Sequence, residues 1–182
     1  PPPPPPPPPP IFFLQPKAAK PDPLWSRGLG DVYKRQAENT SGNKWSFYTG
    51  MFDFSDDGKK STLIGVQHQN ENLYRDSFLG TISPVSGFLI TGDSATYLYT
   101  GIQAEYNIGK MNLTPSFTPG LYGQGDGKDL GHIVEFKSEL QLSFDLLKDS
   151  ELGFSYNHIS NASLGDKNPG ANSYMFNFLK KF

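Results

Sequence analysis

The sequence has 182 residues, with 16 Lys and Arg against 18 Asp and Glu, and no cysteine. A chain without cysteine has neither a disulfide framework nor thiolate chemistry. The slightly acidic balance argues against a nucleic-acid partner, which would require a basic face. No segment approaches the ~20 consecutive apolar residues of a transmembrane helix.

The first 36 residues differ in composition from the rest. Pro1 to Pro10 is an unbroken proline run, and Ser26 to Gln36 resembles an in-frame translation of a sequencing adapter. We therefore expect 1–36 to be an artefactual or disordered segment, the alternative being a natural proline-rich tether. We also expect the native amino terminus, with any signal peptide, to be missing.

Residues 37–182 have a length that suits one domain. The first 36 residues hold 5 of the 16 basic and 2 of the 18 acidic residues, so this domain has 11 basic and 16 acidic residues, a formal net charge of −5.

From Lys44 onward, apolar and polar residues alternate. The segments that we predict as strands are 44–54, 61–69, 78–90, 95–107, 111–121, 133–146, 152–160 and a last strand that includes 173–178. Turn residues separate most of them, among them Gly92-Asp93, Gly109 and Lys148-Asp149-Ser150.

The segment 133–146 shows the alternation most clearly. One face carries Val134, Phe136, Leu140, Leu142, Phe144 and Leu146 with Ser138, and the other carries Glu135, Lys137, Glu139, Gln141, Ser143 and Asp145. A period of two over this length predicts a β-strand, because a helix would scatter these residues around its circumference.

The fold class that we predict is all-β, an eight-stranded antiparallel transmembrane β-barrel. An eight-stranded barrel has too small an interior for so many Phe, Leu and Tyr side chains, so the apolar faces should point outward. This disfavours the alternative of a soluble, lipid-carrying barrel. The aromatic residues expected to form an interfacial girdle are Trp45, Tyr48, Tyr106, Tyr122, Tyr156 and Tyr174.

The chain ends in an alternating strand closed by Phe182. A terminal aromatic residue resembles the signal by which the barrel assembly machinery recognises outer-membrane barrels. We therefore predict a location in the bacterial outer membrane. The sequence leaves open whether the barrel forms a homodimer.

His158 and Ser160 are the candidate catalytic residues. They are two positions apart, so they project from one face of a strand, together with Leu152, Phe154 and Tyr156. A histidine within reach of a serine can act as its general base. In an even-stranded barrel this strand would end at the outer leaflet, where a long connection follows. The alternative is that His158 and Ser160 have no catalytic role and form hydrogen bonds with water or lipid headgroups at the membrane interface.

The stretch His158-Ile159-Ser160-Asn161-Ala162, followed by Asn168-Pro169-Gly170, resembles the active site of the lipid A 3-O-deacylases. The upstream segments Pro119-Gly120-Leu121-Tyr122 and Leu130-Gly131 also resemble that family. The resemblance implies a carboxylic ester hydrolase that removes the 3-position hydroxyacyl chain of lipid A in lipopolysaccharide, without a metal or cofactor.

The same resemblance implies roles for individual residues. Ser160 would be the nucleophile, His158 its general base and Asn168 the donor to the oxyanion. The family's third member is a glutamate, and Asn172 stands at that position here. An amide can orient the imidazole but cannot stabilise its charge, so we expect reduced activity. Asp166 is an alternative acid.

A non-catalytic outer-membrane barrel, built for adhesion or membrane integrity, is the second functional hypothesis. In that case His158 and Ser160 would be incidental. His132 would lie near the same end of the barrel as an interfacial side chain, and His68 receives no role.

Overall fold

The computed structural model describes residues 1–3, 42–56, 58–70, 73–77 and 80–182. Its strands are β1 (Asn43–Phe52), β2 (Ser61–Asn70), β3 (Arg75–Ser77), β4 (Gly80–Thr91), β5 (Thr96–Ile108), β6 (Met111–Gly123), β7 (Val134–Leu147), β8 (Ser150–Ser160) and β9 (Ala171–Lys181). All of them lie in the second of the two units into which the chain divides, Arg35–Phe182. The expectation for residues 1–36 falls outside the described part of the chain, apart from the first three prolines.

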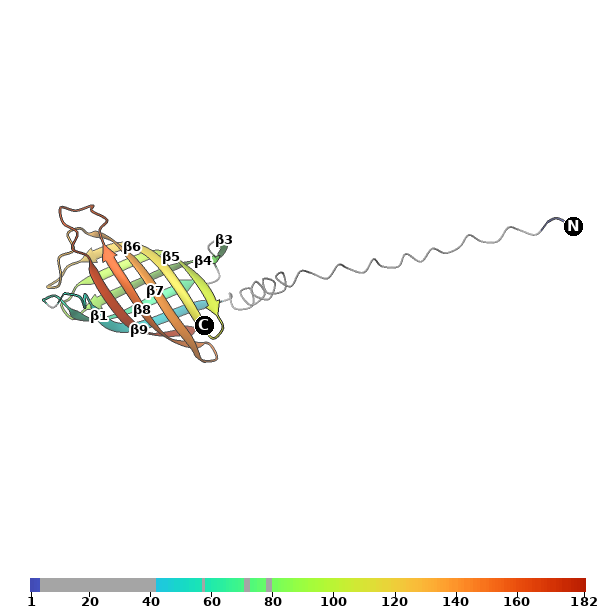
Figure 1. Cartoon of the computed structure of the whole chain (residues 1–182), viewed down its shortest axis with the longest axis horizontal. Helices are drawn as coiled ribbons and strands as arrows, with labels where there is room; N and C mark the ends of the chain where they lie inside the picture. The colour runs from blue at the N-terminus through green and yellow to red at the C-terminus, as the bar shows by residue number, and fades with distance from the viewer. Residues whose placement is uncertain (4–41, 57, 71–72, 78–79) are drawn as a thin grey trace. The chain divides into compact units, whose positions relative to one another are not determined.

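Eight of these strands form a closed antiparallel barrel (Figure 1). Sequential strands pair along the sheet, and the pairing of β1 with β9 and of β2 with β4 completes the ring. The predicted fold class is therefore confirmed. The short strand β3 was not predicted, because three residues are too few to show an alternation, and it only extends the edge of β4. In the described residues no helix is long and apolar enough to cross a membrane.

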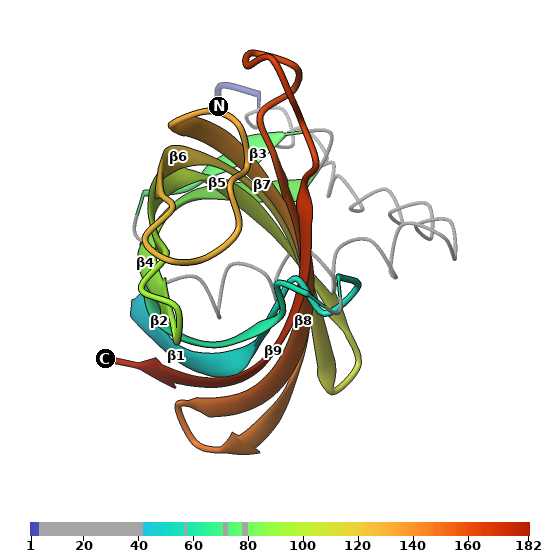
Figure 2. The ribbon, with the colours of Figure 1, turned by 90° about the vertical axis from the view of Figure 1, so that its left-hand side faces the viewer.

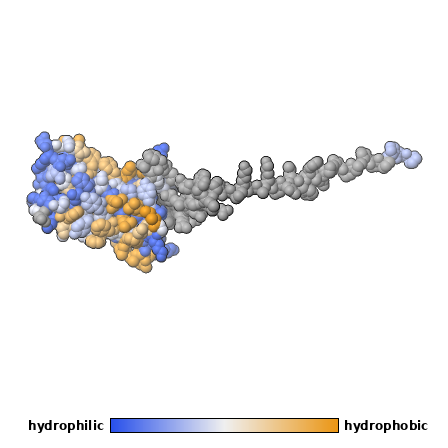
Figure 3. Space-filling view, in the orientation of Figure 1, coloured by the Kyte–Doolittle hydropathy of each residue, from blue (hydrophilic) through white to orange (hydrophobic). Residues whose placement is uncertain are grey.

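Large apolar side chains cover the outer wall of the barrel, as the alternation predicts. The exposed ones include Phe47, Ile64, Leu98, Ile102, Phe117, Leu140, Phe144, Leu152, Phe154 and Phe176. Figure 3 shows apolar surface over the barrel wall and a more hydrophilic surface at the left-hand end. An apolar exterior around a polar interior is the pattern of a barrel whose wall faces lipid.

Several of the charged side chains inside the barrel pair with one another. Lys44, only 1% exposed, lies 2.8 Å from Glu105 and 3.1 Å from Glu151. Lys137, also 1% exposed, lies 2.8 Å from Glu139 and 3.8 Å from the ring centre of Tyr99. A buried charge is costly unless it is paired, so this pairing is what permits a charged lumen.

Tyr48 and Tyr122 do not belong to an outer girdle, and this part of the prediction was wrong. Both side chains are buried and face inward, where Tyr48 hydrogen-bonds Tyr99 and Tyr122 stacks on Phe52. Their positions in the alternation along β1 and β6 place both side chains on the inward face of the sheet. Glycines in the neighbouring strands make the room: a Cβ at Gly65 would lie 2.3 Å from the Tyr48 ring. The other four girdle residues, Trp45, Tyr106, Tyr156 and Tyr174, are exposed or half-buried.

The two ends of the barrel differ. The connections 53–60, 92–95, 124–133 and 161–170 lie at one end, which we call the loop end, and Figure 2 looks onto it. The opposite end, the turn end, has two-residue turns at 109–110 and 148–149. Strand β8 runs from the turn end to the loop end, so its last residues reach the loops.

Candidate functional site

His158 and Ser160 occupy the end of β8, next to the loop end. In the register of the sheet, His158 lies opposite Asn172 on β9 and opposite Ser138 on β7. The His158 side chain is exposed on the outer wall and that of Ser160 is half-buried. The shared outward face therefore agrees with the predicted alternation. Within the described residues the Ser160 hydroxyl makes no hydrogen bond, to His158 or to any other group.

His158 contacts Asn172 directly. The Nδ1 atom of His158 lies 2.8 Å from Oδ1 of Asn172. An amide oxygen only accepts, so this contact requires the proton of a neutral imidazole to sit on Nδ1. The Nε2 atom is then unprotonated and able to accept a proton, which is the tautomer that a general base for serine needs.

The side chain of Asn172 is held by two further hydroxyl groups. The Tyr156 hydroxyl donates to Asn172 Oδ1 over 2.9 Å, and Asn172 Nδ2 donates to the Ser55 hydroxyl over 3.1 Å. The amide is thus contacted at both of its polar atoms. Sequence reasoning anticipated the contact with His158 but missed both Tyr156 and Ser55.

The loop after β1 also forms hydrogen bonds with the backbone of β9. The N–H of Phe54 donates to the carbonyl of Asn172 over 3.0 Å, and the N–H of Asn172 donates to Asp53 Oδ1 over 3.3 Å. Asp53 is buried, has a φ of 49° and forms an ion pair with Lys128. These contacts fix the position of the loop relative to Asn172.

Gly170 lies close to the Cε1 and Nε2 atoms of the His158 ring. A Cβ at this position would lie 2.8 Å from His158 Cε1 and 3.3 Å from Nε2. The φ of Gly170 is 62°, a conformation that side-chain-bearing residues rarely adopt. Both the close approach and the backbone angle therefore require glycine here.

Asn168 is anchored at one end of its amide. Its Oδ1 accepts a hydrogen bond of 3.0 Å from the backbone N–H of Asn161, directly after Ser160. The Asn168 NH₂ group has no partner among the described residues, and the side chain is exposed. The loop thus holds an amide whose donor is free, close in sequence to the candidate nucleophile.

Asn161 joins the two large loops of the loop end. It is fully buried, and its Nδ2 donates to the carbonyls of Leu130 and Lys167, each over 2.8 Å. An exposed ion pair of 2.7 Å between Lys167 and Asp129 spans the same loops. Hydrogen bonds from Lys167 and from the Gly131 N–H hold the pKa of Asp129 below its ordinary value. The contribution of this pair is therefore present at neutral pH and lost as the pH falls through the folded-state pKa.

The remaining sequence candidates do not join the site. Asp166 is exposed and makes no hydrogen bond or ion pair within the described residues, so nothing places it as a substitute acid. The side chain of His132 contacts the start of β7, where its Nδ1 accepts a hydrogen bond of 3.0 Å from the backbone N–H of Val134. His68 bonds Asn43 over 3.1 Å at the turn end. No group of three metal-ligating side chains occurs in the described part of the chain.

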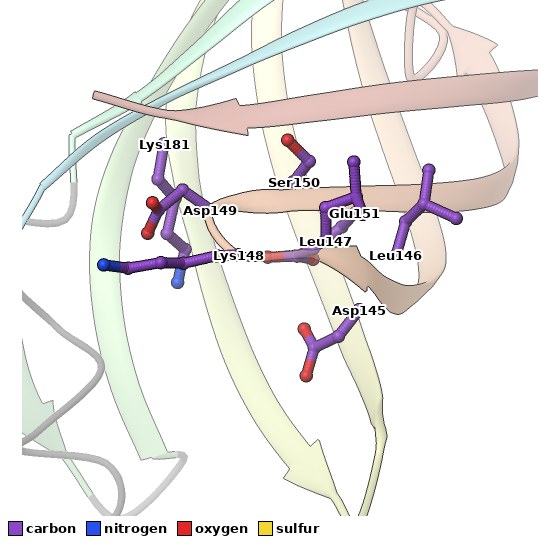
Figure 4. A pocket seen from close by; sticks show the side chains of 8 residues that line it. All are labelled: Asp145, Leu146, Leu147, Lys148, Asp149, Ser150, Glu151 and Lys181. Atoms are coloured by element: carbon purple, nitrogen blue, oxygen red, sulfur yellow. The ribbon is translucent and has the colours of Figure 1, made fainter.

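An open hollow of about 510 Å³ lies at the turn end (Figure 4). It is lined by the β7–β8 turn and by Lys181, and the figure shows Lys148, Asp149 and Asp145 around it. These side chains are charged but include no histidine, and they lie at the opposite end of β8 from His158. The hollow is therefore separate from the candidate site.

The model of the lipid A 3-O-deacylase (PagL) family matches residues 39–181. The chain belongs to this family. The match covers nearly the whole described barrel, including every residue of the candidate site. It confirms the family that the residues around His158 and Ser160 resemble.

Two solved structures, PagL and a designed barrel, share this fold. The crystal structure of the outer membrane enzyme PagL is 15% identical over 76% of this chain and 99% of its own, with a TM-score of 0.58. A de novo designed transmembrane β-barrel is 10% identical over 78% of this chain and 98% of its own, with a TM-score of 0.51. The outer membrane protein Ail of Yersinia pestis is 14% identical over 78% of this chain and 100% of its own, with a TM-score of 0.44. No curated protein matches the chain.

Family membership and the lipid-facing barrel wall place this lipid A 3-O-deacylase family member in the bacterial outer membrane. Its activity class is that of a lipid A deacylase, a hydrolase.

Proposed function

We propose that this protein is a serine esterase that hydrolyses the 3-position ester of lipid A from the outer leaflet. The observation that carries the proposal is the 2.8 Å contact between His158 Nδ1 and Asn172 Oδ1, beside Ser160 on the same outward face of β8. A lipid-facing site gives direct access to an ester whose acyl chain lies in the membrane. The substrate need not leave the bilayer.

In the first half of the reaction, the Ser160 hydroxyl attacks the ester carbonyl and its proton passes to His158 Nε2. The free NH₂ group of Asn168 donates a hydrogen bond to the oxyanion. The C–O bond to the sugar then breaks, and His158 returns the proton to the departing sugar oxygen. The hydroxyacyl chain remains as an ester on Ser160.

In the second half, water attacks this acyl-enzyme and gives a proton to His158. The bond to Ser160 breaks, the proton returns to the Ser160 oxygen and a 3-hydroxy fatty acid leaves. Asn172 keeps the imidazole in the reactive tautomer throughout. Because it is neutral, it stabilises the imidazolium less than a carboxylate would, so the reaction should be slow.

The test is mass spectrometry of purified lipid A after incubation with the chain refolded in detergent. Loss of one 3-position hydroxyacyl chain is expected with the parent and not with Ser160→Ala. Ser138→Ala is the matched control, because Ser138 lies opposite His158 on the other neighbouring strand, and it should keep the activity. An unchanged lipid A with a folded parent would contradict the proposal and favour a barrel for adhesion or membrane integrity.

Two partner predictions accompany this function. The first is that the barrel assembly machinery recognises the exposed terminal Phe182, which a binding measurement would test. The second is that the barrel assembles into a homodimer, which a sedimentation measurement would test.

A further inference from the structure

Ser55 lies beside the candidate site although it is 117 residues from Asn172 in the sequence. It belongs to the loop between β1 and β2, and the family resemblance assigns it no role. The closure of the barrel between β1 and β9 brings it there, since Met51 pairs with Tyr174 and the chain continues past Asn172. Figure 2 shows this loop beside the strands β8 and β9.

We propose that Ser55 is a positioning residue, which holds the amide of Asn172 in the one orientation that supports catalysis by His158. This inference rests on the proposed function, because it concerns how the imidazole is kept competent. Ser55 acts through Asn172 and is not itself a catalytic residue.

The need for positioning follows from the asymmetry of an amide. A carboxylate presents an acceptor whichever way it turns, whereas an amide presents an acceptor on one side and a donor on the other. If the Asn172 amide turned over, Nδ2 would face His158 Nδ1 and would favour the tautomer protonated on Nε2. That tautomer cannot accept the proton of Ser160.

The charged state of His158 decides which orientation is required. An imidazolium donates from both nitrogens, so Asn172 must present Oδ1 to it and Nδ2 must face the loop. Ser55 is placed to accept from Nδ2 there, at 3.1 Å. The Tyr156 hydroxyl supports the same orientation by donating to Oδ1. A hydroxyl can donate as well as accept, but only the accepting role of Ser55 is compatible with the imidazolium.

The loop is held firmly enough to perform this task. Its backbone is joined to Asn172 by the Phe54 N–H and by the carboxylate of Asp53, which is buried and paired with Lys128. The aromatic ring of Phe54 also packs 5.5 Å from that of Tyr174. Removing only the Ser55 hydroxyl should therefore leave the loop in place.

The first experiment measures the tautomer of His158 directly. The full chain, labelled with ¹⁵N-histidine and refolded in detergent micelles, is studied at a pH where the ring is neutral. With three histidines in the chain, His158→Gln assigns the signal. The parent should show the proton on Nδ1, Ser55→Ala should show a population with the proton on Nε2, and Ser55→Thr, which keeps the hydroxyl, should resemble the parent. An unchanged Nδ1 tautomer in Ser55→Ala would overturn the proposal.

The second experiment compares the effect of Ser55→Ala in the parent with its effect in Asn172→Glu, whose carboxylate presents an acceptor in either orientation. Ser55→Ala should lower kcat about fivefold with KM unchanged, as expected for the loss of one hydrogen bond that does not touch substrate. In the Asn172→Glu background the same change should alter kcat less than about twofold, because no NH₂ group remains to be held. Equal losses in both backgrounds would overturn the proposal. A parent without activity would refute the proposed function, and the tautomer measurement would still decide the role of Ser55.

Discussion

The Nδ1 atom of His158 and the Oδ1 atom of Asn172 lie 2.8 Å apart across the β8–β9 ladder, and the two residues are 14 positions apart in the chain. The two side chains face each other because the register pairs these residues directly. Asn172 therefore stands where it can orient the imidazole, although it lacks the charge of the glutamate that the family resemblance implies.

Replacing Asn172 with glutamate should raise the rate of deacylation by about tenfold or more, because a carboxylate stabilises the imidazolium that forms as Ser160 attacks. The measurement is the initial rate of 3-hydroxy fatty acid release from lipid A in mixed micelles. Asn172→Leu, which cannot accept a hydrogen bond, should be slower than the parent. A glutamate variant that is no faster than the parent would show that charge at this position does not limit the reaction.

Gly170→Ala should reduce the rate by at least about tenfold, because the added Cβ meets the His158 ring at 2.8 Å and must displace it. Gly109→Ala is the matched control. Its φ of 68° imposes a similar backbone strain, but nothing lies within 4 Å of the added Cβ. The control should fold and keep full activity. If both variants lost activity equally, backbone strain rather than contact with the ring would be responsible.

Asn168→Asp separates the two ends of the Asn168 side chain. The aspartate keeps an oxygen to accept from the Asn161 N–H, so the loop should stay in place. It has no NH₂ group to donate to an oxyanion, and kcat should fall about 10²–10³-fold. The rate is measured beside Asn168→Gln, which keeps a donor on a longer side chain. A fully active aspartate variant would exclude Asn168 as the oxyanion donor.

Asn161→Ala should loosen the loop end, because it leaves the carbonyls of Leu130 and Lys167 without their buried donor. The expected cost is about 1–3 kcal/mol for each unsatisfied group. Limited proteolysis of the folded barrel should cleave the loops 124–133 and 161–170 faster than in the parent. Lys167→Ala, which removes only an exposed ion pair, should change the cleavage rate little. The reverse order of sensitivity would refute the role of Asn161.

The strands and their faces could be predicted from the sequence because alternation is a local property. The odd or even position of a residue along a strand, as for Glu135 and Phe136, determines which side of the sheet it faces. An outward-facing apolar surface followed because the interior of an eight-stranded barrel is too small for all of the large apolar side chains. The inward positions of Tyr48 and Tyr122 follow from the same parity. The prediction that Tyr48 and Tyr122 belong to the aromatic girdle failed because it relied on residue type and not on the position of each residue in the alternation.

For the site, the sequence by itself determined what lies close along the chain: the pair His158 and Ser160 on one face, and Asn168 in the loop that follows. Only the tertiary structure decided that Ser55 reaches Asn172, since no local pattern connects residues 117 positions apart. Barrel closure supplies this contact. The pairing of β1 with β9 fixes their register over eight residue pairs. Because this register places the end of β1 beside the start of β9, the loop that follows β1 lies against the start of β9.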